Sequence, residues 1–310
     1  MTLTRTPRFV PPPRHAVQSP MAPLALPRGA RLHMVPTGLD NLCWLLEYAP
    51  GRVAVIDGPA AADPLRYCGA HHLTPTHVLN THTHGDHVGL NEGVAAWAEC
   101  RGRALEVWGP AARAAEVPLL TRGLEEGDAL ELGDLRGAVW RTEGHLDGHL
   151  SFVFEGVVFC GDTLFGAGCG YLFDGPPSVM RESLERLAGL PAETLVCCAH
   201  EYTLDNLHFA LTAPSASAAT LARLSAARAL RAAGSSTLPS TVGLERETNP
   251  FLLVSREGFA ALRALKDAKV YRQRTLEELA EELAEELAGP MGTAGGEAGG
   301  EAGGAREGGA

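Results

Sequence analysis

The sequence predicts a layered α/β protein with a helical region toward its carboxyl-terminal end. Short apolar runs, each long enough for one buried strand, alternate with helix-length segments between about residues 32 and 199. Histidine and aspartate residues follow several of these runs, where layered α/β folds place their functional sites. At 310 residues and 45% hydrophobic composition, the chain can form one large domain or one large and one smaller domain.

The predicted strands are bounded by glycine, proline or polar residues. They cover residues 42–46, 53–56, 77–80, 105–108, two segments around Gly133 within 128–140, then 151–154, 157–160 and 195–199. Helices are predicted at residues 63–72, 91–100, 215–233 and 257–268. Segment 215–233 is rich in Ala, Leu and Arg and has no proline or glycine, which favours a helix.

The strongest functional signal is Thr81-His82-Thr83-His84-Gly85-Asp86-His87, directly after the strand at 77–80. Imidazole and carboxylate groups are ligands for zinc, iron or manganese, and this loop holds enough of them for two ions. A polar loop with incidental histidines is the weaker interpretation, because histidine is scarce and this spacing rarely arises by chance. Three later strand ends add His145, Asp162 and His200, which could complete the two sites.

The loop THTHGDH resembles the HxHxDH motif of the metallo-β-lactamase superfamily. The resemblance implies an αββα sandwich with its metal site at one edge. It implies one ion held by His82, His84 and His145, a second by Asp86, His87 and His200, and Asp162 as the bridge between them. A water between two ions roughly 3.5–4 Å apart would form hydroxide at neutral pH, with Asp86 and Asp162 as the catalytic carboxylates. His149 is expected to be structural.

Further motifs resemble glyoxalase II, the hydroxyacylglutathione hydrolases, over roughly residues 32–270. They are residues 162–170 (DTLFGAGCG), 200–203 (HEYT) with Asn206, and 247–252 (ETNPFL). The resemblance implies hydrolysis of S-D-lactoylglutathione to D-lactate and glutathione, as in methylglyoxal detoxification, with a small helical domain over the site. A persulfide dioxygenase with one iron is the alternative, but it lacks the HEYT and NPF segments and the helical domain. A metallo-hydrolase for another thioester and an inactive binding protein are further alternatives.

The expected glutathione contacts depart from the pattern of the family. The resemblance assigns them to Tyr171, Phe173, Tyr202, Leu253 and Arg256. Tyr202 and Arg256 match, whereas Tyr171 and Leu253 replace basic residues and Phe173 replaces a tyrosine. A sheltered cation that binds a carboxylate contributes about 1.5–3 kcal/mol, so we expect weakened or altered glutathione recognition.

Composition excludes several classes of partner. The net charge of −11 argues against nucleic acid, whose phosphates attract a basic surface. No apolar run approaches the roughly 18 residues that span a bilayer, so we expect a soluble protein with no membrane partner. We also expect a monomer. The seven cysteines form no CxxC pair, which indicates reduced, structural thiols in a reducing compartment.

The chain divides into four expected segments. Residues 1–30 are either a disordered leader or an organelle transit peptide, because residues 1–39 hold five Arg and no Asp or Glu. The expected location is therefore cytoplasmic, or mitochondrial or plastid if the leader is a transit peptide. Residues 31–203 form the catalytic domain and 204–272 a helical substrate-binding domain. Residues 273–310 are predicted to form a loosely docked or solvated acidic helix, without cationic partners for its glutamates, and a disordered Gly/Ala/Glu tail.

Overall fold

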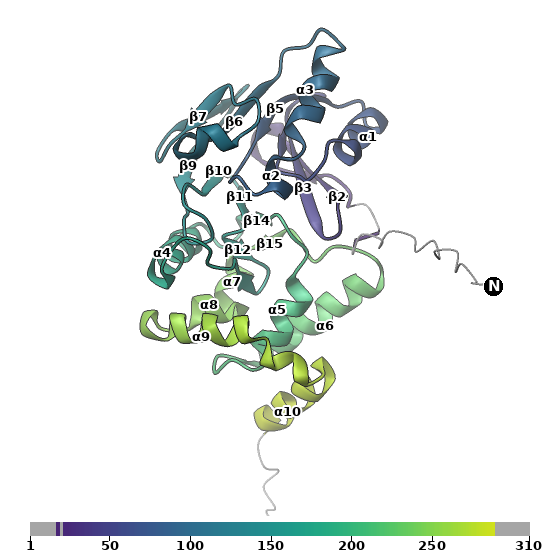
Figure 1. Ribbon diagram of the computed structural model, residues 1–310. Helices are drawn as coiled ribbons and strands as arrows, with labels where there is room; N and C mark the ends of the chain where they lie inside the picture. Colours follow the sequence, from purple (N-terminus) through teal and green to yellow (C-terminus); the bar gives the residue numbers. More distant parts are fainter. Residues whose placement is uncertain (1–16, 19–20, 289–310) are drawn as a thin grey trace, which may run out of the picture.

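The structure consists of two mixed β-sheets and the helices packed around them (Figure 1). It is a computed structural model that describes residues 17–18 and 21–288. The first sheet has the strand order β1-β2-β3-β4-β5-β6-β7, and the second has β15-β14-β11-β10-β9-β8. Within the first sheet, β4, β5, β6 and β7 pair in parallel with one another, so the chain needs crossover connections there. The expected layered α/β class is confirmed.

The bounds of the elements are as follows. The first sheet consists of β1 (Leu24–Ala25), β2 (Arg31–Thr37), β3 (Asn41–Ala49), β4 (Arg52–Ile56), β5 (Thr74–Leu79), β6 (Glu106–Pro110) and β7 (Arg122–Leu124). The second consists of β8 (Ala129–Leu132), β9 (Leu135–Arg141), β10 (Leu150–Phe154), β11 (Val157–Gly161), β14 (Leu195–Cys198) and β15 (Ser240–Thr241), and a hairpin pairs β12 (Leu164–Phe165) with β13 (Gly168–Cys169). The helices are α1 (Ala62–Ala70), α2 (Gly85–Val88), α3 (Asn91–Glu99), α4 (Pro177–Ala188), α5 (Thr203–Ala210), α6 (Ala218–Ala232), α7 (Val242–Thr248), α8 (Pro250–Leu253), α9 (Arg256–Ala268) and α10 (Leu276–Ala288), with 3-10 turns at Pro27–Gly29, Ala111–Glu116 and Val270–Gln273.

The first sheet is buried on both faces. Along β3, Leu42, Trp44 and Leu46 join the core between the sheets, whereas Cys43 and Leu45 point to the opposite face. Successive side chains of a strand alternate between faces, so a continuous apolar run such as this one indicates a strand covered on both sides. Helices α1 and α3 contact β5 and complete the outer face.

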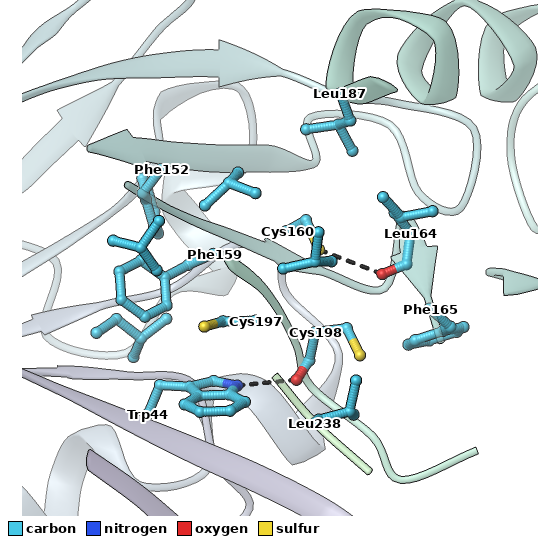
Figure 2. Close-up of a cluster of buried hydrophobic side chains, with 14 of the residues drawn as sticks. Trp44, Phe152, Phe159, Cys160, Leu164, Phe165, Leu187, Cys197, Cys198 and Leu238 are labelled. Carbon is cyan, nitrogen blue, oxygen red and sulfur yellow. Dashed lines mark hydrogen bonds between the residues drawn. The ribbon is translucent and has the colours of Figure 1, made fainter. Parts of the chain in front are cut away.

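The core between the sheets fixes the end of strand β14 (Figure 2). Trp44 of the first sheet donates its indole N–H to the carbonyl of Cys198 in the second, at 2.8 Å. Phe152 and Phe159 fill the adjoining space. All seven cysteines are free thiols and all but Cys100 are buried, as the sequence predicts. Because Cys198 ends β14, this bond holds the strand that leads to His200.

Part of the expected leader has a defined structure. Strand β1 pairs with β2, and Leu24 packs partly against the main core. Residues 21–30 are therefore part of the fold rather than disordered, because their apolar side chains reach the edge of the first sheet. The rest of the leader and the predicted Gly/Ala/Glu tail lie in residues 1–16, 19–20 and 289–310, outside the described residues.

Helix α10 is docked, which corrects the expectation of a loosely held or solvated helix. Leu279 and Leu283 are buried in a cluster with residues of α5 and α6. Two of its glutamates also have cationic partners, since Arg228 pairs with Glu277 and Arg274 with Glu282. Sequence reasoning considered only charges within the helix, whereas these cations come from elsewhere in the chain. Among the described helices, none is long and apolar enough to cross a membrane.

Docking of α10 can be tested with two matched leucine substitutions. Leu283→Ala should weaken docking by about 2–3 kcal/mol, because it removes a buried side chain. Amide hydrogen exchange in Leu276–Ala288 should then rise about 30- to 100-fold. Leu287→Ala is the control, since Leu287 is 50% exposed and the change in helix propensity is the same. Equal exchange in the two variants would contradict a docked helix.

Candidate active site

The histidine-rich loop leaves the end of β5 and leads into the short helix α2. His84 is the residue before α2, and Asp86 and His87 lie within its single turn. The loop is fixed from inside the protein: Asn80 donates its side-chain amide to the carbonyl of His87 at 3.0 Å. Asn91 of α3 in turn donates to the side-chain oxygen of Asn80 at 2.7 Å. The side chains of the loop are therefore held in place by buried amides.

The structure brings the seven sequence-predicted metal ligands together in two adjoining groups. The groups are His82, His84, His145 and Asp162, and Asp86, His87 and His200, with the ligand atoms of each group within 4.8 Å of one another. In the first group, Nδ1 of His84 lies 3.0 Å from Nε2 of both His82 and His145. Asp162 joins the groups, because its Oδ1 lies 3.5 Å from Nε2 of both His87 and His200.

Asp57, at the end of β4, orients two of the histidines, and sequence reasoning missed it. Its carboxylate accepts hydrogen bonds from the backbone N–H of Thr81 at 2.9 Å, the Thr81 hydroxyl at 2.7 Å and Nδ1 of His87 at 3.0 Å. The Thr81 hydroxyl also lies 3.1 Å from Nδ1 of His82. Protonation of both histidines at Nδ1 leaves each Nε2 facing the cluster.

His145 and His200 are oriented in the same way by different partners. Nδ1 of His145 lies 2.8 Å from the carbonyl of Tyr171, which can only accept a hydrogen bond. Nδ1 of His200 lies 2.9 Å from the carboxylate of Asp40. Both rings therefore carry a proton on Nδ1 and direct Nε2 at the cluster. Asp40 is a second residue that sequence reasoning missed.

Unpartnered buried atoms at the centre of the cluster fit a bound cation. Three buried side-chain polar atoms in the described parts of the chain lack a hydrogen-bond partner, and two of them are His87 Nε2 and Asp162 Oδ1. Such atoms are costly to bury, so native structures normally satisfy them. A divalent cation between them would accept both lone pairs. The donor set of histidine nitrogens and carboxylate oxygens is also one that divalent metals take.

The pKa values of the histidines suit the same role. Burial lowers the pKa of His82, His84 and His145, so these imidazoles are neutral and able to coordinate. Burial would also lower the pKa of His200, but the nearby carboxylates, Asp162 first among them, outweigh it and raise this pKa to about 9. Without a metal, the excess of carboxylate charge is thus balanced by protons on histidine.

His149 has the structural role expected of it. Its ring is fully buried, and its Nε2 accepts the backbone N–H of Asp162 at 3.2 Å. Its Nδ1 lies 3.2 Å from the hydroxyls of Thr142 and Thr163. His149 therefore positions the chain at Asp162 and is not a member of either ligand group.

The ligand groups open into a pocket of about 460 Å³. Its walls include His84, Asp86, His145, Asp162 and His200, together with aromatic side chains. These aromatic residues are Phe165, Tyr171, Phe173 and Tyr202. Tyr202 stacks on the His200 ring with centroids 4.7 Å apart and an interplanar angle of 5°. A carbonyl compound that enters this pocket would meet the ligand groups on one side and aromatic rings on the other.

A second pocket, of about 430 Å³, adjoins the first and is rich in cations. The two pockets share the walls formed by Phe165, Tyr171 and Tyr202. The second is lined by four basic residues of α9 and the turn after it: Arg263, Lys266, Lys269 and Arg272. Two acids, Asp205 and Asp267, also line it, so cations are in excess. The arrangement suits an anionic group attached to whatever occupies the first pocket.

The expected substrate contacts divide between these pockets and the surface. Tyr171 and Tyr202 line both pockets, and Phe173 lines the first. Arg256 lines neither; it lies at the start of α9 and pairs with Glu185 on the surface. Leu253 lies on α8 and is also outside both pockets. The basic residues of the pocket thus lie 7 to 16 residues further along the chain than Arg256, from Arg263 to Arg272.

The hairpin β12–β13, which supplies Phe165 and leads to Tyr171, is held by the helical region. Asn249 donates its amide to the carbonyl of Gly168 at 2.9 Å. Glu245 accepts the backbone N–H of Ala167 at 2.9 Å, and pairs with Arg223 in the interior. The NPF segment therefore fixes the wall between the two pockets.

Comparison with known proteins agrees with this geometry. A model of the metallo-β-lactamase superfamily matches residues 36–200, and a model of the hydroxyacylglutathione hydrolase carboxyl terminus matches residues 201–273. A hydroxyacylglutathione hydrolase of Xanthomonas euvesicatoria is 43% identical over 227 residues, or 73% of this chain and 86% of its own. One from Rhodospirillum rubrum is 42% identical over 233 residues, 74% of this chain and 88% of its own. The chain belongs to the hydroxyacylglutathione hydrolase family.

Solved structures show the superfamily fold at lower identity. A crystal structure of ETHE1 from Myxococcus xanthus has a TM-score of 0.55 and 23% identity, and it covers 80% of this chain and 94% of that one. The BLEG-1 B3 metallo-β-lactamase has a TM-score of 0.54 and 20% identity, with 72% and 100% covered. As a hydroxyacylglutathione hydrolase with a buried His/Asp cluster, this protein is a divalent-metal-binding enzyme.

Asp57 should control the affinity for metal. Asp57→Asn keeps the size of the side chain but removes the carboxylate that fixes His87 and Thr81, so the apparent dissociation constant for zinc should rise about 10- to 100-fold. Competition with a coloured chelator measures it. Asp134→Asn, in the exposed turn between β8 and β9, is the control for loss of one negative charge. Equal affinity in the two variants would show that Asp57 does not orient the ligands.

Proposed function

We propose that this protein hydrolyses glutathione thioesters, with S-D-lactoylglutathione as substrate and D-lactate and glutathione as products. The observation that carries the proposal is the shared wall between the two pockets. A glutathione thioester has a reactive carbonyl on the sulfur of its central cysteine and one carboxylate at each end of the peptide. The ligand groups suit the carbonyl, and the cations of α9 suit the carboxylates.

The basic pocket supports glutathione recognition despite the missing basic residues at 171 and 253. Arg263 is buried and donates to the carbonyl of Cys169 at 3.1 Å, so its guanidinium is held in place. Lys266 contacts Asp205 at 2.9 Å. Burial lowers the pKa of Lys266 to about 8, only partly offset by Asp205, so it is mostly protonated at neutral pH. We propose that these cations replace those that the sequence analysis sought after the NPF segment.

We propose two zinc ions at the ligand groups, with iron or manganese as the alternatives that the same donors accept. His82, His84 and His145 would hold one, and Asp86, His87 and His200 the other, with Asp162 shared. Such ions supply Lewis acidity, which lowers the pKa of a bound water and polarises the thioester carbonyl.

The chain itself orients the reactants. Asp86 is more exposed than Asp162, at 41% against 9% of the side chain. Its Oδ2 accepts a hydrogen bond from Asn41 at 3.0 Å and lies 3.3 Å from His200 Nε2. We propose that Asp86 and Asp162 are the catalytic carboxylates, which accept hydrogen bonds from the attacking water and fix its direction. Tyr202 and Phe165 would shield the thioester sulfur from solvent, since they line both pockets.

Two other reactions remain as alternatives to be tested. A persulfide dioxygenase is disfavoured, because the chain matches the carboxyl-terminal model of the hydroxyacylglutathione hydrolases over residues 201–273. A hydrolase for a thioester with another acyl group is compatible with Phe173, an exposed aromatic ring at the rim of the first pocket. For the compartment, we propose the cytoplasm, where free thiols persist, and for the assembly a monomer.

Loss of a pocket cation should raise KM. For Lys266→Met, KM for S-D-lactoylglutathione should rise about 10- to 100-fold, because a carboxylate loses a sheltered cation. Arg256→Gln is the control, because it removes a charge from the same helix outside both pockets, and KM should change less than about threefold. Steady-state hydrolysis measures both. A larger rise for Arg256→Gln than for Lys266→Met would overturn the assignment of the pocket.

Metal removal should abolish hydrolysis. Dialysis against a chelator should remove about two ions per chain and all measurable thioesterase activity, and zinc should restore both. Elemental analysis counts the ions. One iron per chain with oxygen uptake on glutathione persulfide would instead identify the dioxygenase, and activity that persists without metal would exclude the proposed reaction.

A further inference from the structure

Lys269 occupies a backbone position that favours glycine. It ends helix α9 with φ 56° and ψ 21°, in the left-handed region. Helices commonly place glycine at such a position, because a Cβ atom there is strained against the backbone. Five other non-glycine residues in the described part of the chain have positive φ, and two of them, Asp57 and Ala167, are fixed by hydrogen bonds at the active site. Lys269 caps α9 and places its own side chain beside the basic pocket.

The side chain of Lys269 lines the basic pocket without a protein partner. Three cations of this pocket face an acid: Arg263 pairs with Asp267, and Lys266 and Arg272 pair with Asp205. Across the described residues, the Lys269 ammonium makes no hydrogen bond or ion pair with the protein, and the residue is exposed. Its charge is thus available to a ligand, whereas the other three cations are already partly neutralised.

We infer that Lys269 binds a carboxylate of the glutathione moiety and sets the preference for glutathione thioesters. The inference rests on the proposed function. Glutathione carries two carboxylates, and a cation without an internal acid is free to bind one of them. Lys269 thus supplies a charge that Tyr171, on the shared wall of the two pockets, does not. The strained backbone at Lys269 is retained because the side chain serves binding.

Three substitutions separate charge from backbone strain. Lys269→Gly removes both, Lys269→Gln removes the charge only, and Lys269→Arg keeps the charge. The substrates are S-D-lactoylglutathione and its diester, in which both glutathione carboxylates are esterified. For the acid, KM should rise about three- to tenfold with glycine and glutamine, with kcat within about twofold, and arginine should restore KM. With the diester, KM should be the same for all four proteins.

Thermal unfolding supplies the second readout. Lys269→Gly should raise Tm by about 1–3 °C by relieving the strain, and Lys269→Gln should not. A lower Tm for the glycine variant, or a KM for the acid that neither neutral variant changes, would overturn the role of Lys269. A rise in KM that is equal for acid and diester would also overturn it. If the unmodified protein hydrolyses neither thioester, the proposed function fails, and the role of Lys269 fails with it.

Discussion

The active site depends on burying imidazoles with one nitrogen fixed and the other free. A buried ring nitrogen without a hydrogen-bond partner costs folding free energy, and His87 Nε2 is in this state. Hydrogen bonds from Nδ1 of His87, His200 and His145 to Asp57, Asp40 and the Tyr171 carbonyl fix the orientation of each ring, with Nε2 toward the cluster. Metal binding then contributes to the stability of the fold, because the ligand arrangement exists only in the folded chain.

The sequence reveals the ligands themselves more readily than the residues that orient them. His82, His84 and Asp86 share one short motif, so their chemistry is visible in the spacing. Asp57 follows a strand far earlier in the chain, and only the parallel pairing of β4 with β5 brings it beside Thr81. Its positive φ of 52° is likewise a property of the folded backbone. No local pattern could have indicated this contact.

The fold was predictable where the residues within one segment are enough to indicate its secondary structure. Apolar runs gave every strand of four or more residues after β2, and a long uninterrupted segment gave α6. Helix α4 was missed, although its sequence carries two helix signals: proline at its start and the spacing of the buried Met180, Leu184 and Leu187. Docking of α10 was missed because its two buried leucines meet α5 and α6 only in three dimensions. Tertiary contacts decide that docking, and helix propensity does not reveal them.

The helical region is part of the active site through one buried network. Glu245 is fully buried and contacts Arg223, Ala167 and Asn249, so three segments meet on one carboxylate. A buried ion pair of this kind adds little net stability but penalises every arrangement in which one partner is left alone. The hairpin β12–β13 therefore cannot leave the helices without losing the bond from the Ala167 N–H to Glu245 and the bond from Asn249 to the Gly168 carbonyl. Since that hairpin walls both pockets, the network keeps the carbonyl end and the carboxylate end of a substrate at a fixed separation.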